Sequence, residues 1–325
     1  MHADPTVVSD LSEQDLLDRI FPHLPVGSRT VVPPGDDAAV VLAADGRYVV
    51  TCDVLVEDVH FRRAWSTGED VGRRAAVQNL ADVAAMGAQP VALVVGLVVP
   101  RDTPVAWVEG FARGLGDVCR PLDVGVVGGD LSSGPVVMVS VTAHGDLEGR
   151  APVRRGGARP GDVVAHAGRR GWSAAGLALL TAGREHDDPG LVAAHRTPQT
   201  DLAAGPAAAR AGATAMLDVS DGLLRDAGRL ARASGVTVEL DDPGTAFADD
   251  AARLVDVAHT LGADPVDWLL TGGEDHGLLA TFPAGAPLPP PFRRIGRVTA
   301  AGPEPVLVAG APPRTGTTGW DHFGA

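Results

Sequence analysis

Aspartate residues stand at the ends of apolar segments along much of this chain. Asp53 lies inside VVTCDVLV, Asp130 ends VGVVGGD, and Asp218 and Asp221 end AMLDVSDG. Burying an unpaired carboxylate is costly or shifts its pKa until the group is neutral. Carboxylates repeated beside apolar strands, with no Cys or His cluster, favour a site for hard cations, Mg²⁺ before Zn²⁺. Several Mg²⁺ ions indicate a polyphosphate substrate, because Mg²⁺ usually binds a few carboxylates together with substrate phosphates.

Acidic residues at two further places in the sequence fit this chemistry. Asp36 and Asp37 follow a glycine in a tight turn. Asp82 follows Asn79 by three residues in a nearly uncharged helical segment, so both face the same side of that helix. A simpler alternative exists for each aspartate alone, since Asp218 with Asp221 could cap a helix.

The basic residues exclude several enzyme classes. All 27 are arginine, and the chain has no lysine. P-loop enzymes and protein kinases use a lysine on the phosphates, so both classes are disfavoured, as is Schiff-base chemistry. A net charge of -14 argues against a nucleic-acid binder, because phosphate backbones require a basic face.

The compartment follows from cysteine use and hydropathy. Cys52 and Cys119 form no CxxC pair, so neither a disulfide framework nor a thiolate metal site is indicated. The polar, acidic beginning of the sequence is unlike a signal peptide, and no apolar run reaches the ~18 residues of a membrane span. We therefore expect a cytoplasmic protein with no membrane or nucleic-acid partner.

Helical and strand patterns alternate along two segments, 1–148 and 149–325, which we interpret as two α/β domains. A stretch rich in Gly, Pro and Arg at 147–161 separates them. The patterns predict helices over 9–21, 71–86, 103–119, 174–181, 203–211, 222–233 and 248–261. They predict strands over 47–56, 91–99, 124–127, 136–143, 163–167, 214–219, 236–240 and 278–282, with GGDLSSG as a turn.

Eight motifs together resemble the thiamine-monophosphate kinase family, within the aminoimidazole-ribonucleotide synthetase-like ATP-binding superfamily. They span almost the whole chain in the family's order: PGDDAA (34–39), TCDVLVEDVHF (51–61), NLADVAAMGAQP (79–90), GGDLSSGP (128–135), ARPGD (158–162), LDVSDGLLRD (217–226), TGGEDHGLL (271–279) and GWDHF (319–323). Each motif alone is weak, but jointly they are specific.

The resemblance implies a fold and a set of residue roles. The fold is of the α/β (α+β) type, with two domains: an N-terminal mixed sheet that pairs with its copy in a homodimer near ATP, and a C-terminal α/β domain that completes the nucleotide and substrate site. The implied magnesium positions are Asp37, Thr51, Cys52, Asp53, Asp82, Asp130, Asp218 and Asp221. The implied ATP contacts are Gly129, Asp130, Arg155 and Ser220, and the implied substrate contacts are His60, Glu274 and Trp320. Asp53, Asp82 and Asp130 are expected to be essential for turnover.

The implied reaction moves the γ-phosphate of ATP onto thiamine monophosphate, giving ADP and thiamine diphosphate. A phosphate oxygen is already ionised at neutral pH, so positioning and charge neutralisation suffice and no strong base is required. Three departures from the family pattern stand out: Cys52 replaces a threonine, His276 and Gly277 change the GGEDYEL motif, and Trp172 replaces a small acidic residue.

Alternatives remain both for single residues and for the function of the protein. Arg155 could be a solvated linker charge, His60 a strand histidine, and Trp320 a residue that docks the tail. The function could be that of another enzyme of the superfamily, although there is no cysteine before Cys52 for a selenophosphate synthetase and no C-terminal cysteine for the hydrogenase-maturation dehydratase. An aminoimidazole-ribonucleotide synthetase, a metal-dependent phosphohydrolase and a nucleotide sensor are the remaining possibilities.

Overall fold

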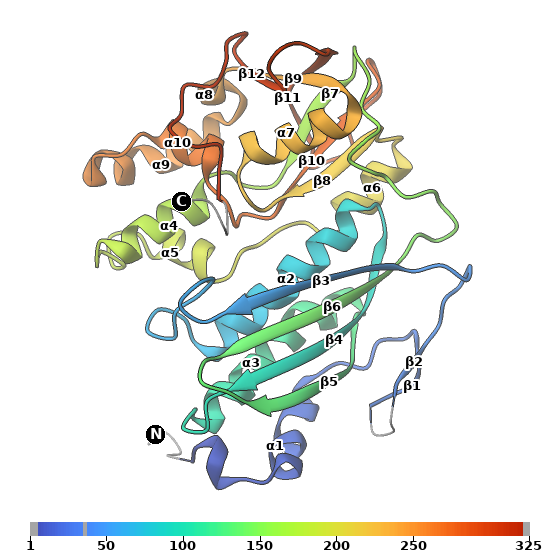
Figure 1. Cartoon of the computed structure of the whole chain (residues 1–325), viewed down its shortest axis with the longest axis vertical. Coiled ribbons are helices and arrows are strands. Elements are labelled where there is room, and N and C mark those ends of the chain that lie inside the picture. The colour runs from blue at the N-terminus through green and yellow to red at the C-terminus, as the bar shows by residue number, and fades with distance from the viewer. Residues whose placement is uncertain (1–5, 35–37, 321–325) are drawn as a thin grey trace. The chain divides into compact units, whose positions relative to one another are not determined.

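The computed structural model describes residues 6–34 and 38–320, and the chain divides into two compact units (Figure 1). The first unit comprises Met1–Val83 and Gln89–Arg150, and the second comprises Ala84–Ala88 and Ala151–Ala325. The short segment Ala84–Ala88, which the sequence patterns assigned to the first domain, thus packs with the second unit. The roles that we expect of the two domains stay predictions.

The first unit is built on a mixed four-stranded sheet in the order β3-β6-β4-β5. Strand β4 pairs with β5 in parallel and with β6 antiparallel, and β3 pairs with β6 antiparallel. This confirms the expected mixed sheet. The strands are β1 (Thr30–Val32), β2 (Val40–Val41), β3 (Val49–Val56), β4 (Gln89–Val99), β5 (Gly125–Ser133) and β6 (Met138–Asp146). The helices are η1 (Val8–Asp10), α1 (Glu13–Ile20), η2 (Phe21–His23), α2 (Gly68–Ala85), α3 (Val105–Cys119) and η3 (Arg120–Leu122).

Helices α2 and α3 cover one face of this sheet (Figure 1). They approach each other backbone to backbone at glycines. A Cβ atom on Gly68 would lie 1.9 Å from the carbonyl oxygen of Trp107, and one on Gly72 would lie 2.1 Å from that of Phe111. Neither position can carry a side chain at this helix separation, which fixes how closely α2 lies beside α3.

The motif GGDLSSG was predicted to be a turn, and this prediction is wrong. Strand β5 runs through it to Ser133 and stays paired with β4 as far as Val99. The long β4 offers backbone partners beyond the glycines, so pairing overrides the local turn propensity. A Cβ on Gly129 would lie 1.9 Å from the carbonyl oxygen of Val95, so glycine is required where the two strands are in register.

The second unit contains a six-stranded sheet in the order β12-β9-β11-β7-β10-β8. All its pairings are antiparallel except that of β12 with β9. The strands are β7 (Val163–Ala167), β8 (Ala215–Val219), β9 (Val236–Leu240), β10 (Gly277–Phe282), β11 (Arg293–Ala300) and β12 (Val306–Val308). The helices are α4 (Trp172–Thr181), α5 (Pro189–Arg196), α6 (Ala204–Arg210), α7 (Leu223–Ser234), α8 (Pro243–Ala246), α9 (Ala248–Leu261) and α10 (Pro265–Thr271). The patterns had not indicated α5, α8, α10, β11 or β12.

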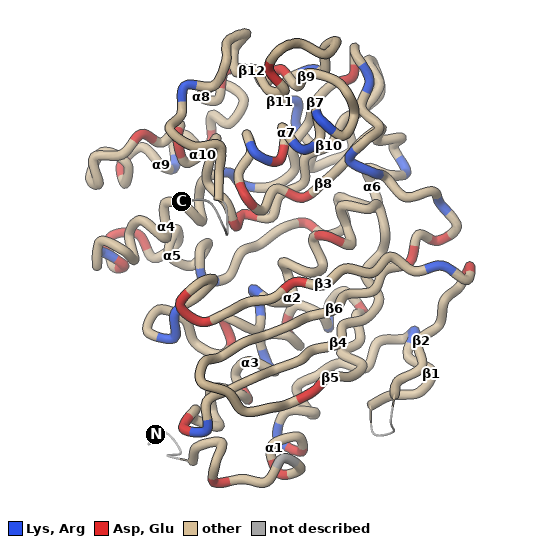
Figure 2. Tube along the Cα trace, viewed as in Figure 1, with Lys and Arg blue, Asp and Glu red and all other residues tan. Residues whose placement is uncertain are grey.

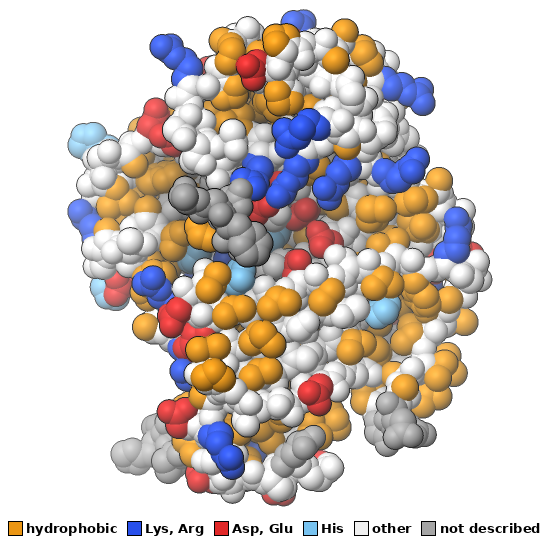
Figure 3. Space-filling model, in the orientation of Figure 1, with side chains coloured by type: hydrophobic (Ala, Val, Ile, Leu, Met, Phe, Trp, Pro, Cys, Tyr) orange, Lys and Arg blue, Asp and Glu red, His pale blue; other side chains and the backbone are white. Residues whose placement is uncertain are grey.

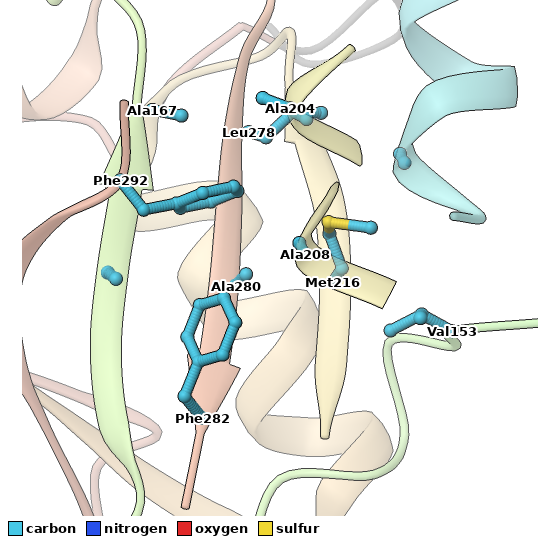
Figure 4. Packing of buried hydrophobic residues seen from close by; sticks show 11 residues of the cluster. Val153, Ala167, Ala204, Ala208, Met216, Leu278, Ala280, Phe282 and Phe292 are labelled. Atoms are coloured by element: carbon cyan, nitrogen blue, oxygen red, sulfur yellow. The ribbon is translucent and has the colours of Figure 1, made fainter. Parts of the chain in front are cut away.

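An apolar core lies on the sheet of the second unit (Figure 4). Phe282 and Phe292 meet edge to face, with ring centroids 5.5 Å apart. Met216 and Leu278, on neighbouring strands, complete this layer with small alanines. The core holds β8 and β10 side by side, and the candidate site residues follow the end of β8 and precede β10. No helix in the described part of the chain is both long and apolar enough to cross a bilayer.

Candidate active site

In the first unit, one group of polar residues joins the edge strand β3 to helix α2. Residues of β3 alternate between its two faces, so Thr51 and Asp53 both point toward α2. The Thr51 hydroxyl donates to Asp82 Oδ2 at 2.8 Å. Asn79, fully buried, accepts the Asp53 backbone N–H at 3.0 Å, and Gln78 donates to Asp53 Oδ2 at 3.0 Å. Asn79 and Asp82 therefore lie on the same side of α2, as their spacing predicted, and that side meets β3.

Cys52 lies on the opposite face of β3. Its thiol is exposed and lies 3.5 Å from the Ser140 hydroxyl on β6. The side chain therefore does not join the group around Asp53, and only the backbone of Cys52 is available for the expected metal contact. Asp37 lies outside the described residues.

Asp130 and Gly129 occupy the other edge of the same sheet. The register aligns Asp53, Val141, Val95 and Gly129 across the four strands. Three strand spacings of about 4.8 Å separate Asp53 from Gly129 by roughly 14 Å. The first unit thus does not bring Asp130 together with Asp53 and Asp82, contrary to the simple picture of converging carboxylates.

A cavity of about 250 Å³ opens beside Gly129 and Asp130. Its walls are largely apolar and come from α1, α3 and the sheet, including Ile20, Val108 and Phe111. Apolar walls with few polar groups are typical of small-molecule sites.

In the second unit, Asp218, Ser220 and Asp221 follow one another around the end of β8 (Figure 2 shows the acidic residues there). Helix α7 begins at Gly222 as its N-cap, with no side-chain cap hydrogen bond, so the helix-cap alternative for Asp218 and Asp221 is wrong. Instead Asp221 Oδ2 pairs with Arg229 at 2.7 Å. Asp226 accepts the Asp221 backbone N–H at 3.0 Å. Burial and the charge of Asp218 raise the pKa of Asp226 to about 6, although Arg229 opposes the shift.

The turn between α10 and β10 brings Glu274 to the same place. Its backbone N–H donates to the Ser220 carbonyl oxygen at 2.8 Å. His276, almost fully buried, lies between two carboxylates, with Nδ1 3.5 Å from Asp218 and Nε2 3.7 Å from Glu274. Burial alone would lower the pKa of His276, but the two carboxylates outweigh burial and raise this pKa to about 10. Because the separations exceed ordinary hydrogen-bond lengths, we interpret the contacts as ion pairs.

Trp320 reaches this group through its backbone, because its N–H donates to the Asp221 carbonyl oxygen at 2.8 Å. Its side chain is 54% exposed. The second unit therefore brings Asp218, Ser220, Asp221, Glu274 and Trp320 together.

His60 and Arg155 each have contacts within their own unit. His60, in the turn after β3, accepts the Val56 N–H through Nδ1 at 3.0 Å. The exposed Arg155 accepts the Ser234 hydroxyl through its carbonyl oxygen.

Sequence reasoning did not assign roles to Gln78, Asp226, Arg229 or His276. His276 carried a visible signal as a departure from the family motif, and Asp226 as the last residue of LDVSDGLLRD. Across residues 6–34 and 38–320, no three His, Cys, Asp or Glu side chains lie close enough to hold a metal ion by themselves. Asp53, Asp82, Asp218 and Asp221 instead contact Gln78, Thr51, His276 and Arg229, respectively.

The chain matches the family models described as AIR synthase related protein, N-terminal domain, over residues 35–147, and AIR synthase related protein, C-terminal domain, over residues 159–304. It is 48% identical over 320 residues to thiamine-monophosphate kinase of Mycobacterium tuberculosis H37Rv, covering 98% of this chain and 94% of the relative. Among solved structures it resembles thiamine-monophosphate kinase from Stenotrophomonas maltophilia K279a (TM-score 0.78, 31% identity, 93% and 98% of the two chains). It also resembles AaThiL complexed with AMPPCP and TMP (TM-score 0.76, 32% identity, 98% and 99%). The chain therefore belongs to the thiamine-monophosphate kinase family.

Proposed function

We propose that this protein transfers the γ-phosphate of ATP to the phosphate of thiamine monophosphate, giving ADP and thiamine diphosphate. One observation carries the proposal: nearly half the residues match a thiamine-monophosphate kinase along almost the full length of both chains. The polar groups on β3 and after β8 are made of the oxygen-rich residues that such a transfer needs. We propose that the reaction takes place in the cytoplasm, where ATP is available as co-substrate.

The donor set fits Mg²⁺. Every candidate side chain except Cys52 offers oxygen, and Mg²⁺ prefers oxygen ligands and completes its shell with substrate phosphates. We assign Thr51, Asp53, Asp82 and Asp130 of the first unit to Mg²⁺, with Asp218 and Asp221 of the second, and the backbone of Cys52. Bound Mg²⁺ would neutralise the charge of the phosphates.

The protein's own residues bind and orient the two substrates. We place the adenine ring in the apolar cavity beside Gly129, and assign Arg155 and Ser220 to ATP, since a guanidinium can clamp phosphate without lysine. Glu274 and the exposed indole of Trp320 suit the cationic thiazolium and its aminopyrimidine. His60 completes the substrate contacts. The acceptor oxygen is ionised, so orientation replaces a general base.

We also propose a homodimer through the outer face of the first unit's sheet. On this face Val50, Val54 and Met138 are 58%, 41% and 38% exposed. Apolar side chains gather over β3 and β6 in Figure 3. A second copy is the occupant that the family resemblance implies, and a twofold axis would place the same face on both sides. Active protein that light scattering shows to be monomeric at micromolar concentration would refute this proposal.

The test of function is a phosphate-transfer assay with thiamine monophosphate and thiamine at equal concentration, with ATP and Mg²⁺. The monophosphate should be converted to the diphosphate, and thiamine should react far more slowly, because its hydroxyl is not ionised and has no phosphate to orient. EDTA should abolish the reaction and Mg²⁺ restore it. Equal rates with the two acceptors would refute the mechanism, and ADP release that ignores the acceptor would identify a phosphohydrolase instead.

A further inference from the structure

The turn Gly272–His276, which carries Glu274, is held in a strained conformation. Glu274 has φ 65° and His276 has φ 51°, both in the left-handed region that L-residues avoid. A Cβ on Gly273 would lie 2.5 Å from the Ser220 carbonyl oxygen, so the turn is pressed against the segment that follows β8. Such strain persists only where the surrounding contacts determine the backbone, and it is concentrated at functional sites.

Two buried charged residues supply those contacts from beneath the turn. The Arg170 side chain is fully buried and donates to the carbonyl oxygens of Leu269 at 3.2 Å and Gly272 at 2.6 Å, at the C-terminal end of α10. The Asp275 carboxylate accepts the N–H groups of Gly171 at 2.6 Å and Ser173 at 2.9 Å, at the N-terminal start of α4. Arg170 and Asp275 lie 3.7 Å apart.

Each charge has the sign that its helix end favours. A cation interacts well with the last carbonyl groups of a helix, and an anion with the first N–H groups. The pair therefore joins the end of α10, the turn and the start of α4 into one braced unit. Neither residue belongs to the candidate binding group, and an arginine and an aspartate this deeply buried are retained only when they are paired.

We propose that Arg170 and Asp275 are positioning residues that hold Glu274 in its left-handed conformation for recognition of the substrate heterocycle. This inference rests on the proposed function, in which Glu274 contacts thiamine monophosphate. Asparagine at 275 could accept only one of the two N–H groups without turning its own NH₂ toward the other. The turn would then relax, and Glu274 would leave the position that Ser220 and Asp275 together define.

The test is a double-mutant cycle of Glu274→Gln and Asp275→Asn, with KM for thiamine monophosphate and for ATP measured separately. We expect Asp275→Asn to raise KM for the monophosphate about tenfold. KM for ATP should rise much less, because the turn contacts Ser220 only through the backbone. In the Glu274→Gln background the same change should have almost no further effect on KM. Arg170→Lys, which keeps the charge but not the planar fork, should give a smaller rise and serves if Asp275→Asn does not fold.

Asp188→Asn is the matched control. Asp188 also caps a helix, accepting the Leu191 N–H at 3.0 Å, and pairs with an arginine, Arg253, at 2.5 Å, but on α5. It should alter stability without altering either KM. Amide hydrogen exchange should accelerate at 273–276 in Asp275→Asn and not in Asp188→Asn, which detects the brace without any substrate.

The outcomes separate the two proposals. A folded Asp275→Asn protein with unchanged KM and exchange, or a rise in KM that is equally large in the Glu274→Gln background, would overturn the positioning role. Faster exchange together with an unchanged KM in Glu274→Gln would instead show that the brace is real but that Glu274 does not contact the substrate. In that case the role of Glu274 in substrate binding is wrong, while the structural role of Arg170 and Asp275 in holding the turn stands.

Discussion

Asn79→Ala tests how the first unit holds its candidate metal ligands. Strand β3 is at the edge of its sheet, and the Asp53 N–H is satisfied by a side chain, the buried Asn79 amide at 3.0 Å. The Asn79 side chain also donates to the Ala75 carbonyl oxygen at 2.9 Å, a carbonyl that in helix α2 is already paired with the Asn79 backbone N–H. The main loss on truncation is therefore the orphaned Asp53 N–H together with a small cavity.

An unsatisfied buried donor costs about 1–3 kcal/mol, and with the cavity we expect a loss of about 2–3 kcal/mol in the free energy of unfolding. For a chain of 325 residues the midpoint of thermal unfolding should fall by roughly 3–4 °C. The Mg²⁺ concentration for half-maximal activity should also rise, because the Asp53 backbone is no longer fixed. Thermal unfolding and a Mg²⁺ titration of the transfer rate measure the two effects.

Gln78→Ala is the comparison variant. Gln78 is only half-buried and donates a single hydrogen bond, to the Asp53 carboxylate. Its loss should cost about 1 kcal/mol or less. If Asn79→Ala unfolds within 1 °C of the wild type and keeps its Mg²⁺ dependence, then Asn79 does not organise β3 and the reasoning fails.

Three further predictions follow from burial elsewhere. Burial raises the pKa of Cys119 to about 12, so a thiol reagent at pH 8 should leave it unmodified in the native protein and react with it only in denaturant. Burial, with Arg170 and Arg293, lowers the pKa of His166 well below 6.5. The unfolded chain therefore binds the proton first, and the free energy of unfolding should decline as pH falls below about 6.5. His166→Leu should flatten this decline when thermal unfolding is measured between pH 7.5 and 5.5. The Thr103 hydroxyl is buried with no hydrogen-bond partner among the described residues, so Thr103→Val should leave the unfolding midpoint equal or higher, and a fall of several degrees would reveal an unseen partner.

Much of the fold was predictable where hydrophobic period and length agree. The helix expected over 248–261 is α9, with the same bounds, and the strands expected over 163–167 and 236–240 are β7 and β9. The helices that were not predicted are short, so hydrophobic periodicity does not reveal them, but each has a recognisable start. Helices α5, α8 and α10 each begin with an Asp-Pro pair, at Asp188, Asp242 and Asp264, in which the aspartate is the N-cap and proline the first helical residue.

The candidate site was harder to predict than the fold, because its contacts join residues far apart in the sequence. The spacing of Asn79 and Asp82 showed that they share a helix face, but not that the face meets β3. Nothing in the sequence indicates that Arg229 pairs with Asp221, or that Arg170 lies beneath a turn 100 residues later. The local sequence pattern predicts helices, strands and motifs. Which residue a charged side chain pairs with depends instead on tertiary packing.

Four of the candidate magnesium ligands share one property that bears on the order of events. Each of the four already has a partner within the protein: Asp53 accepts from Gln78, Asp82 accepts the Thr51 hydroxyl, Asp218 faces His276, and Asp221 pairs with Arg229. These partners lessen the repulsion between carboxylates, but a metal must compete with them for the same oxygens. A cation bound to ATP would bring phosphates that complete its shell, whereas a free ion would have to displace those partners alone. If these residues hold Mg²⁺, their present partners would therefore favour entry of the ion with the nucleotide.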